Sequence, residues 1–577
     1  MPGRSLMKIE SADHRRRTIN VDWTTQPEPV PNVLKIAHVA DEATGNAHDR
    51  FRAPTMLGGT VDFDVPHERS ESAKQVLAEG RKKGANLSGA DLPAIEKAIA
   101  DPPDHFICHA ARNGWYGLER RAFVRSTGVV GHIGGLQRLQ PPRPKDGEAV
   151  LITFRKAGTV QGWIDEVAMP ARFSSRAILV IAATFAAPLL RILRFPSFGF
   201  NLFGANKSGK STITTVAGSI IGLPNEAALP NLNTTTAGLL QLAGVFNDIG
   251  LPLNEMALLG PKAYEQLGPA IYALGESRDR TRHKASTFAS DIEQSSFSTI
   301  FFFNSERSID ELARQIGRER PGGEKARCLD VPALQGGRRT VFDCRPGGVS
   351  EKDFHRWALG QMVKLRKGCQ ANHGVVFDAY LERLIALGDE VEVRARQYAD
   401  AFVHSLDLQD AESEIEHAAK CFGVIYAGAR IAMDVGILPR PWRPLNVRRA
   451  ITRCFQEAQR TARLGDPVLR KAKEQLHARL LHLNLPRRDS VQPGVDLGYR
   501  WQDGDGEHVT IQATQFSSWF EKRELTAILT WLDQTGALRK ANPENIPNGS
   551  GHDWAVSWPR WTKGGKKVRS ITFRLPN

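Results

Sequence analysis

Cysteine is scarce in this sequence: the chain of 577 residues has six, at positions 108, 328, 344, 369, 421 and 454. No two of them form a C-x-x-C pair, and none has a histidine partner at zinc-finger spacing. This scatter excludes a disulfide framework and a cysteine-based zinc fold, and it is typical of reduced thiols in a cytoplasm. We therefore expect a cytoplasmic protein.

A long apolar run is also missing. The most apolar stretch, Ala177–Leu190, contains Pro188 and is bracketed by Arg176 and Arg191. A membrane-spanning helix needs about 20 apolar residues, so this stretch predicts a buried core helix and no membrane partner. The N-terminus is basic without an apolar segment, so we expect no secretory signal.

Positive charge is what the chain has in excess. Lys and Arg total 77 against 63 Asp and Glu, which gives a net charge of +14. Apolar residues make up 41% of the chain and charged residues 24%, as in folded proteins. A basic surplus indicates a polyanionic partner, and the weak membrane signal favours nucleic acid over an anionic membrane surface.

One motif carries chemistry. Residues Gly204–Thr212 read GANKSGKST and fit G-x-x-x-x-G-K-[ST]. In this motif the glycines let backbone N–H groups point at phosphate oxygens, the lysine (Lys210) lies by the β- and γ-phosphates, and the serine (Ser211) offers a hydroxyl to Mg²⁺. A strand-like run, Phe198–Phe203, precedes the loop and a helix-like run, Ser211–Ile221, follows it, as the motif requires. The predicted nucleotide-binding residues are Gly204, Ala205, Asn206, Lys207, Ser208, Gly209, Lys210, Ser211 and Thr212.

An acidic partner for this loop occurs in VFNDIGLPLNEMALL, at Asn254–Glu255. Glu255 could orient or deprotonate an attacking water, while the residue before it normally holds Mg²⁺ through a carboxylate. Here that metal position is Asn254, a neutral amide that coordinates magnesium less strongly. The alternative is that Glu255 is a solvated loop acid, because the strand before it is short and contains Pro252.

Two further candidates follow dense strand-like runs. STIFFFNSE, Ser298–Glu306, delivers Asn304 to a strand end, where its amide could position the lytic water or sense the γ-phosphate; a turn asparagine is the alternative. KARCLDVPA places Arg327 on a run that resembles another strand. A buried strand-end arginine is costly unless it meets an anion, so Arg327 is either an arginine finger or part of a plain salt bridge.

A basic run, ESRDRTRHKAS at 276–286, lies between these strands and contains Arg280, Arg282 and Lys284. It is a candidate DNA-binding hairpin or a source of phosphate-contacting charge in trans. A lone charge run is more often a solvated loop, and that alternative stays open.

Together these stretches resemble a known family. GTVQGWIDEVAMPA (158–171), GANKSGKST, NEMALL, ESRDRTRHKAS, FFFNSE and KARCLDVPA are similar to the domain-of-unknown-function 927 family over roughly residues 105–345. That family resembles P-loop helicases of the AAA+ and superfamily 3 kind, found with replication modules of phages, plasmids and genomic islands.

The resemblance implies roles for named residues. Lys210 would contact phosphates and Ser211 the magnesium ion, Glu255 would be the Walker B glutamate, and Asn254 stands where the family usually has Asp. Asn304 would be the sensor, Arg327 would reach a neighbouring subunit's nucleotide, and the Arg278–Lys284 segment would lie near a central pore. The missing carboxylate at 254 leaves open a slow ATPase or a nucleotide-dependent assembly switch.

We therefore expect an α/β protein with a P-loop AAA+-type core, a β-rich N-terminal module, a helical block and a winged-helix-like end. In the N-terminal region the one good helical pattern is Ser72–Ile99, and no primase or zinc pattern is present. At the other end, a helix over 525–538 followed by WAVSW and VRSITFRL has the order of a winged helix. The predicted segments are 1–104, partly flexible; 105–172, β-rich; 173–345, P-loop ATPase core; 346–436, helical; 437–490, a basic helical arm; and 491–577, winged-helix-like.

The leading hypothesis is an ATP- and Mg²⁺-dependent, ring-forming DNA helicase. We expect a homo-oligomer, a hexamer, on single-stranded DNA, with a primase or polymerase as a further partner. The alternative is an ATP-binding DNA-associated initiator or defence regulator in which nucleotide controls oligomerisation. A metabolic kinase is less attractive, because it needs neither the basic surplus nor the winged-helix-like end.

Overall fold

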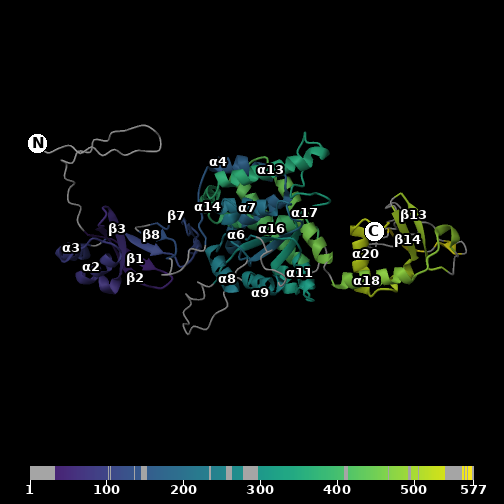
Figure 1. The fold of residues 1–577 in the computed structure, drawn as a ribbon, viewed down its shortest axis with the longest axis horizontal. Coiled ribbons are helices and arrows are strands. Elements are labelled where there is room, and N and C mark those ends of the chain that lie inside the picture. Colours follow the sequence, from purple (N-terminus) through teal and green to yellow (C-terminus); the bar gives the residue numbers. More distant parts are fainter. Residues whose placement is uncertain are drawn as a thin grey trace. The chain divides into compact units, whose positions relative to one another are not determined.

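The computed structural model describes residues 33–101, 103, 105–134, 137–143, 152–232, 235–254, 263–276, 296–408, 413–464, 467–491, 496–504, 506–539, 562–563, 566–567 and 569–574. They fall into two compact units, one within 1–112 and 131–145 and the other within 113–130 and 146–577 (Figure 1). Both mix helices and sheets, as the predicted α/β class requires.

The first unit is built on a five-stranded sheet in the order β3-β2-β1-β4-β8. Its first three strands pair antiparallel, and β1, β4 and β8 run parallel. The side chains of β2 alternate between solvent and core, so that Phe51 and Ala53 join Phe63, Val76 and Ile95 in one apolar cluster. The strands are β1 (Leu34–Asp41), β2 (Ala47–Pro54), β3 (Thr60–Pro66), β4 (Phe106–His109) and β8 (Gln137–Gln140).

The helical pattern predicted over Ser72–Ile99 is divided in the structure. It forms α2 (Ala73–Lys82) and α3 (Leu92–Ala100), and Gly84 between them has a φ of +92°. A left-handed backbone cannot continue an α-helix, so the chain turns there. Val76 of α2 and Ile95 of α3 both lie in the apolar cluster of the first unit.

The second unit contains a parallel sheet in the order β10-β11-β9-β12. All residues of β11 are buried, and Phe302 of β11 stacks on Phe200 of β9 with ring centroids 5.1 Å apart. Continuous apolar runs of this kind are expected for parallel strands covered on both faces. The strands are β9 (Phe198–Phe203), β10 (Leu251–Pro252), β11 (Ile300–Ser305) and β12 (Cys328–Pro332).

The apolar stretch before this sheet is helix α6 (Ser175–Leu193). It is long and apolar enough to cross a membrane, but 94% of its most apolar window is buried inside the protein. It packs against α16 (Ser413–Asp434), where a Cβ added at Gly428 would lie 2.5 Å from the backbone nitrogen of Ala186. This agrees with the prediction of a buried core helix.

The segment predicted as one basic arm over 437–490 contains two helices with different partners. Helix α17 (Pro444–Leu464) adds Val447, Ile451 and Phe455 to the apolar core that contains the buried residues of α6 and the parallel sheet. Helix α18 (Pro467–His482) instead packs against α20 (Lys522–Gln534). The apolar residues of α17 recur at helical spacing, so one face is buried. Arg448 and Arg449 are exposed, whereas Arg453 is partly buried and donates to Asp343.

The C-terminal part has its own core. Leu476, Val509, Phe516, Ile528 and Phe573 join α18, α19 (Ala513–Ser517), α20 and a three-stranded antiparallel sheet, β13-β14-β17. These strands are β13 (Gly498–Asp503), β14 (Gly506–Gln512) and β17 (Ser570–Arg574). Strand β17 lies in the predicted run VRSITFRL, whereas WAVSW lies outside the described residues, so the winged helix stays a prediction.

A buried carboxylate attaches β5 (Gly114–Tyr116) to the core. Asp248 Oδ2 accepts hydrogen bonds from the backbone N–H of Trp115 (3.0 Å) and from Arg191 Nη1 (3.3 Å). Asp248 is fully buried, and within the described residues its Oδ1 has no hydrogen-bond partner. Burial raises the pKa of the Asp248 carboxyl to about 6, although Arg191 and the Trp115 N–H act in the opposite direction.

We predict that Asp248→Asn changes how stability depends on pH. The Asp248 carboxyl has a higher pKa in the folded chain than in the unfolded chain. Its contribution to the free energy of unfolding is therefore full below the unfolded-chain pKa, and it is lost as the pH rises through the folded-chain pKa of about 6. From about pH 4 to about pH 7 the wild type should lose on the order of 2–3 kcal/mol more unfolding free energy than Asp248→Asn. Urea unfolding followed by tryptophan fluorescence measures this, with the exposed Asp400→Asn as control; equal pH dependence in Asp248→Asn and wild type would contradict the prediction.

Candidate nucleotide-binding site

The glycine-rich loop connects the end of β9 to α7 (Lys210–Ile221). Its backbone is left-handed at Lys207, with φ 59°, and at Gly209, with φ 102°. A Cβ at position 209 would lie 2.5 Å from Met362 Sδ and 3.0 Å from Val341 Cγ2. Glycine is therefore required at 209 both by the backbone angle and by the space. The strand–loop–helix order agrees with the sequence prediction.

Lys210 lies at the first turn of α7 with its ammonium group held by the loop. Its Nζ donates to the carbonyl oxygens of Gly204 (2.7 Å) and Ala205 (2.8 Å), and the residue is 8% exposed. The first backbone N–H groups of a helix and its dipole favour an anion at this end. Lys210 adds a full positive charge at the same place.

Asn304 reaches the loop from the neighbouring strand. In the parallel pairing of β11 with β9, Asn304 lies opposite Leu202 and Ser305 opposite Phe203, so β11 ends beside the loop. Thr214 Oγ1 of α7 donates to Asn304 Oδ1 at 2.8 Å. The Asn304 side-chain Nδ2 is buried and has no hydrogen-bond partner in the described part of the chain. Because Thr214 fixes the amide through its oxygen, the N–H₂ group is left for an acceptor.

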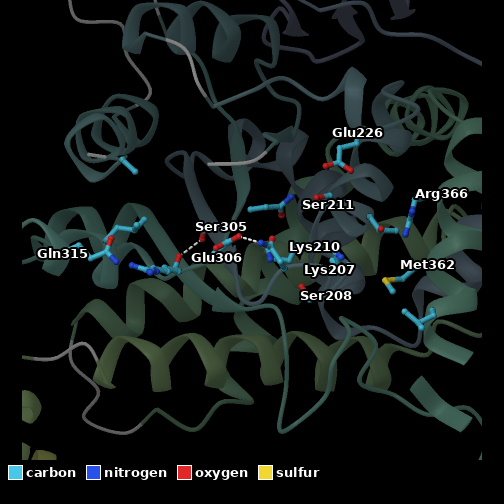
Figure 2. A pocket seen from close by; sticks show the side chains of 18 residues that line it. Lys207, Ser208, Lys210, Ser211, Glu226, Ser305, Glu306, Gln315, Met362 and Arg366 are labelled. Atoms are coloured by element: carbon cyan, nitrogen blue, oxygen red, sulfur yellow. Dashed lines mark hydrogen bonds between the residues drawn. The ribbon is translucent and has the colours of Figure 1, made fainter. Parts of the chain in front are cut away.

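These groups meet in a cavity of about 620 Å³. Figure 2 shows the side chains of Lys207, Ser208, Lys210 and Ser211, with Gln315 on one side and Met362 and Arg366 on the other. The volume lies in the range of small-molecule sites, about 300–1,000 Å³. The described lining consists of Asn206, Lys207, Ser208, Gly209, Lys210, Ser211, Thr212, Glu226, Ala263, Asn304, Ser305, Glu306, Arg307, Leu312, Gln315, Leu359, Met362 and Arg366.

The lining combines charged and apolar side chains. Four of its side chains are cationic (Lys207, Lys210, Arg307 and Arg366), whereas two, Glu226 and Glu306, are acidic. Leu312, Leu359, Met362 and Ala263 contribute apolar surface. A lining with more cationic than acidic groups and with apolar surface suits an anionic ligand that also has an apolar part.

The structure brings together most of the predicted loop residues. Asn206 to Thr212 and Asn304 line the cavity, and Gly204 and Ala205 contribute carbonyl oxygens to Lys210. Asn254 does not line it: its Nδ2 donates to the Glu226 carbonyl oxygen at 3.5 Å, and its backbone bridges to Asn231. Glu255 and the basic residues Arg280, Arg282 and Lys284 lie outside the described residues.

Arg327 has a different setting from the one its pattern indicates. It is the last residue of helix α12 (Gly322–Arg327), not part of strand β12, and it does not line the cavity. Its Nη1 donates to the Gly323 carbonyl oxygen at 2.7 Å, and its guanidinium carbon lies 5.0 Å from the Tyr272 ring centroid. The strand begins one residue later because the buried apolar run starts at Cys328.

The buried arginine at this edge of the sheet is Arg320. Its Nε donates to Glu324 Oε1 (2.8 Å) and its Nη1 to Asp330 Oδ2 (3.1 Å). Asp330 also accepts from Asn201 Nδ2 at 2.7 Å, and Asn201 Oδ1 accepts from Ser305 Oγ at 2.7 Å. This chain of hydrogen bonds ties β12 and β9 to the end of β11 that carries Asn304.

Several lining residues were not predicted from the sequence. Leu359, Met362 and Arg366 come from α13 (Glu351–Ala371), which follows the segment assigned to the core. No local motif marks them, because only the tertiary packing of α13 brings them to the loop. Glu306 and Arg307 had a usable signal, since they directly follow the strand end that carries Asn304; Glu306 accepts a hydrogen bond from Asn206 Nδ2.

With this geometry in place, comparison with known proteins gives a family. Residues 81–289 match DUF927, a domain of unknown function. The match covers 209 of the 577 residues. It contains the loop Gly204–Thr212 and Asn254, and it ends before Asn304 and Arg327. No curated protein matches the sequence.

The fold is similar to a solved structure that covers almost the whole chain. SCCmec type IV Cch, described as an active helicase, superposes with a TM-score of 0.53. The match spans 94% of this chain and 93% of Cch at 14% sequence identity. The similarity therefore extends beyond the DUF927 region on both sides and concerns the fold.

We predict that Thr214→Val destabilises the second unit by about 1–3 kcal/mol, because it leaves the buried Asn304 Oδ1 without its donor. Thr214→Ser keeps the hydroxyl and should lose less. Urea unfolding of both variants measures the effect. In an Asn304→Ala background Thr214→Val should cost less; an unchanged cost there would show that the hydrogen bond does not carry the effect.

Proposed function

We propose that this protein is an ATP-dependent, ring-forming DNA helicase or translocase of a mobile-element or phage replication module. The observation that carries the proposal is the convergence of the glycine-rich loop, Lys210 and the unpaired Asn304 N–H₂ on one cavity at the carboxyl edge of a parallel sheet. Ligands of open parallel sheets bind at this edge. An α/β fold similar to that of an SCCmec helicase over most of the chain supports the helicase class.

The described residues fit a nucleoside triphosphate with Mg²⁺. Lys210 and the first N–H groups of α7 would bind the β- and γ-phosphates, and the Ser211 hydroxyl would be a magnesium ligand. The bound ion would neutralise charge on the phosphates. Asn304 would donate its N–H₂ to the γ-phosphate or the attacking water, and Glu255 would accept a proton from that water.

The other partners follow from charge. The net charge of +14 and the exposed arginines of α17, such as Arg448 and Arg449, suit a phosphodiester backbone. Arg280, Arg282 and Lys284 would contact single-stranded DNA in a ring pore. Arg327 is partly exposed and does not line the cavity of its own subunit. It would contact the nucleotide of a neighbouring subunit in a homo-oligomer, for which we propose a hexamer.

We predict that Lys210→Ala abolishes ATP binding and DNA unwinding together, because it removes the cation that neutralises the phosphates. Fluorescent nucleotide binding and a forked-duplex unwinding assay measure the two activities. Lys364→Ala, an exposed lysine on α13, is the control and should retain both. DNA-stimulated ATP turnover in Lys210→Ala would overturn the assignment.

A second function is favoured by Asn254. Without a carboxylate at this position, and with its amide directed to Glu226, the site loses one magnesium-shell charge. Nucleotide would then control oligomerisation of a DNA-associated initiator or defence regulator. Steady-state ATP turnover with and without single-stranded DNA separates the two functions: absent turnover with intact ATP binding supports the switch.

Arg327 gives a test of the ring. We predict that Arg327→Ala retains ATP binding and loses turnover by on the order of 10³-fold, as expected for an arginine finger. Mixing Arg327→Ala with Lys210→Ala should restore turnover, because a subunit with intact Lys210 then meets a neighbour with intact Arg327. Arg318→Ala, at an exposed arginine that does not line the cavity, is the control and should retain both ATP binding and turnover. If the mixture stays inactive while Arg327→Ala alone is inactive, Arg327 does not act in trans.

A further inference from the structure

Three side chains in the first unit converge on one point, far in the sequence from the glycine-rich loop. His38, Asp49 and His67 each offer a ligand atom, and these atoms lie within 4.8 Å of one another. The distances are 2.5 Å from His38 Nδ1 to Asp49 Oδ1 and 3.0 Å from His67 Nδ1 to Asp49 Oδ2. Each residue comes from a different element: β1, β2 and α1 (His67–Ser70).

The sheet register explains the convergence. His38 and Asp49 are directly opposite in the antiparallel pairing of β1 with β2, so their side chains leave the same face. Strand β3 returns beside β2 and ends at Pro66, opposite His48, which brings His67 next to Asp49. The fold thus assembles three ligands that no short sequence motif contains.

The donor set has the chemistry of a transition-metal site. Two imidazole nitrogens and one carboxylate are ligands that zinc prefers, and three protein ligands leave one position for water. The Asp49 side chain is fully buried, whereas the side chains of His38 and His67 are 32% and 57% exposed. The two imidazole rings thus reach solvent, whereas the carboxylate does not.

Neighbouring groups hold the ligands in place. Ser70 Oγ donates to Asp49 Oδ2, and Lys35 Nζ lies 3.4 Å from Oδ1. The Phe106 ring stacks on His38 with centroids 5.3 Å apart. Supporting contacts of this kind orient metal ligands. Without a metal, the Asp49 carboxylate accepts hydrogen bonds from the Nδ1 atoms of His38 and His67. The experiment distinguishes this metal-free state from a zinc-bound state.

We propose that His38, Asp49 and His67 form a zinc-binding site that joins β1, β2 and α1. This site is independent of the nucleotide function. The ion would take the place of the hydrogen bonds from the two imidazole Nδ1 atoms to the carboxylate, and each ring would then carry its proton on Nε2.

The experiment uses the full-length protein, stripped with a chelator and titrated with ZnCl₂ in a calorimeter, with metal content measured by mass spectrometry after desalting. The wild type should bind one zinc per chain and gain thermal stability. His67→Ala should bind zinc on the order of 10–100-fold more weakly and lose that gain. Substitution with Co²⁺ should give the visible absorption of a low-coordinate site in the wild type only.

Asp49→Asn tests the buried ligand, and because it can unfold the sheet, the half-exposed His67→Ala is the primary variant. His132→Ala, an exposed histidine of the same unit, is the matched control and should bind zinc as the wild type does. Zinc uptake in His67→Ala equal to that of the wild type overturns the proposal. Absence of zinc binding by the wild type overturns it too, and shows that the cluster is held by protons alone.

Discussion

The parallel pairing of β9 with β11 is the constraint from which the candidate site follows. Both strands are buried, so polar groups are placed where the strands end, and the register puts Ser305 opposite Phe203 at the start of the glycine-rich loop. Asn304 can then accept from Thr214 in the helix that the loop begins. The pairing thus brings loop, helix and neighbouring strand together, and the Lys210 ammonium group adds its bonds to the Gly204 and Ala205 carbonyl oxygens.

A network of buried charged and polar side chains fixes this edge of the sheet. Arg320 is enclosed by Glu324 and Asp330, and Asp330 is linked through Asn201 to Ser305. Removing one partner of a buried ion pair costs far more stability than the intact pair contributes. Such a network therefore fixes a geometry more than it adds stability. Here the geometry that it fixes is the strand end that carries Asn304.

The sequence predicted the parts of the site that are local. The loop and its flanking strand and helix are contiguous, and Asn304 ends a dense run of strand-forming residues, so a pattern is enough to find them. Arg366 and Met362 could not be found in this way, because a helix in another predicted segment brings them to the loop. The pattern places Arg327 on a strand because the residues KAR directly precede strand β12. The basic segment 437–490 resembles one arm because its charge does not show which apolar faces of its two helices are buried. His38, Asp49 and His67 are joined only by strand register.

The close contact between Gly209 and Met362 also changes what counts as the functional unit. The predicted boundary at residue 345 separates the motif from α13, yet α13 forms one wall of the cavity and leaves no room for a side chain at 209. A chain cut at 345 would keep every residue of the glycine-rich loop and lose Leu359, Met362 and Arg366, which line the cavity. The loop and the helix that follows the predicted boundary are therefore parts of one structural unit.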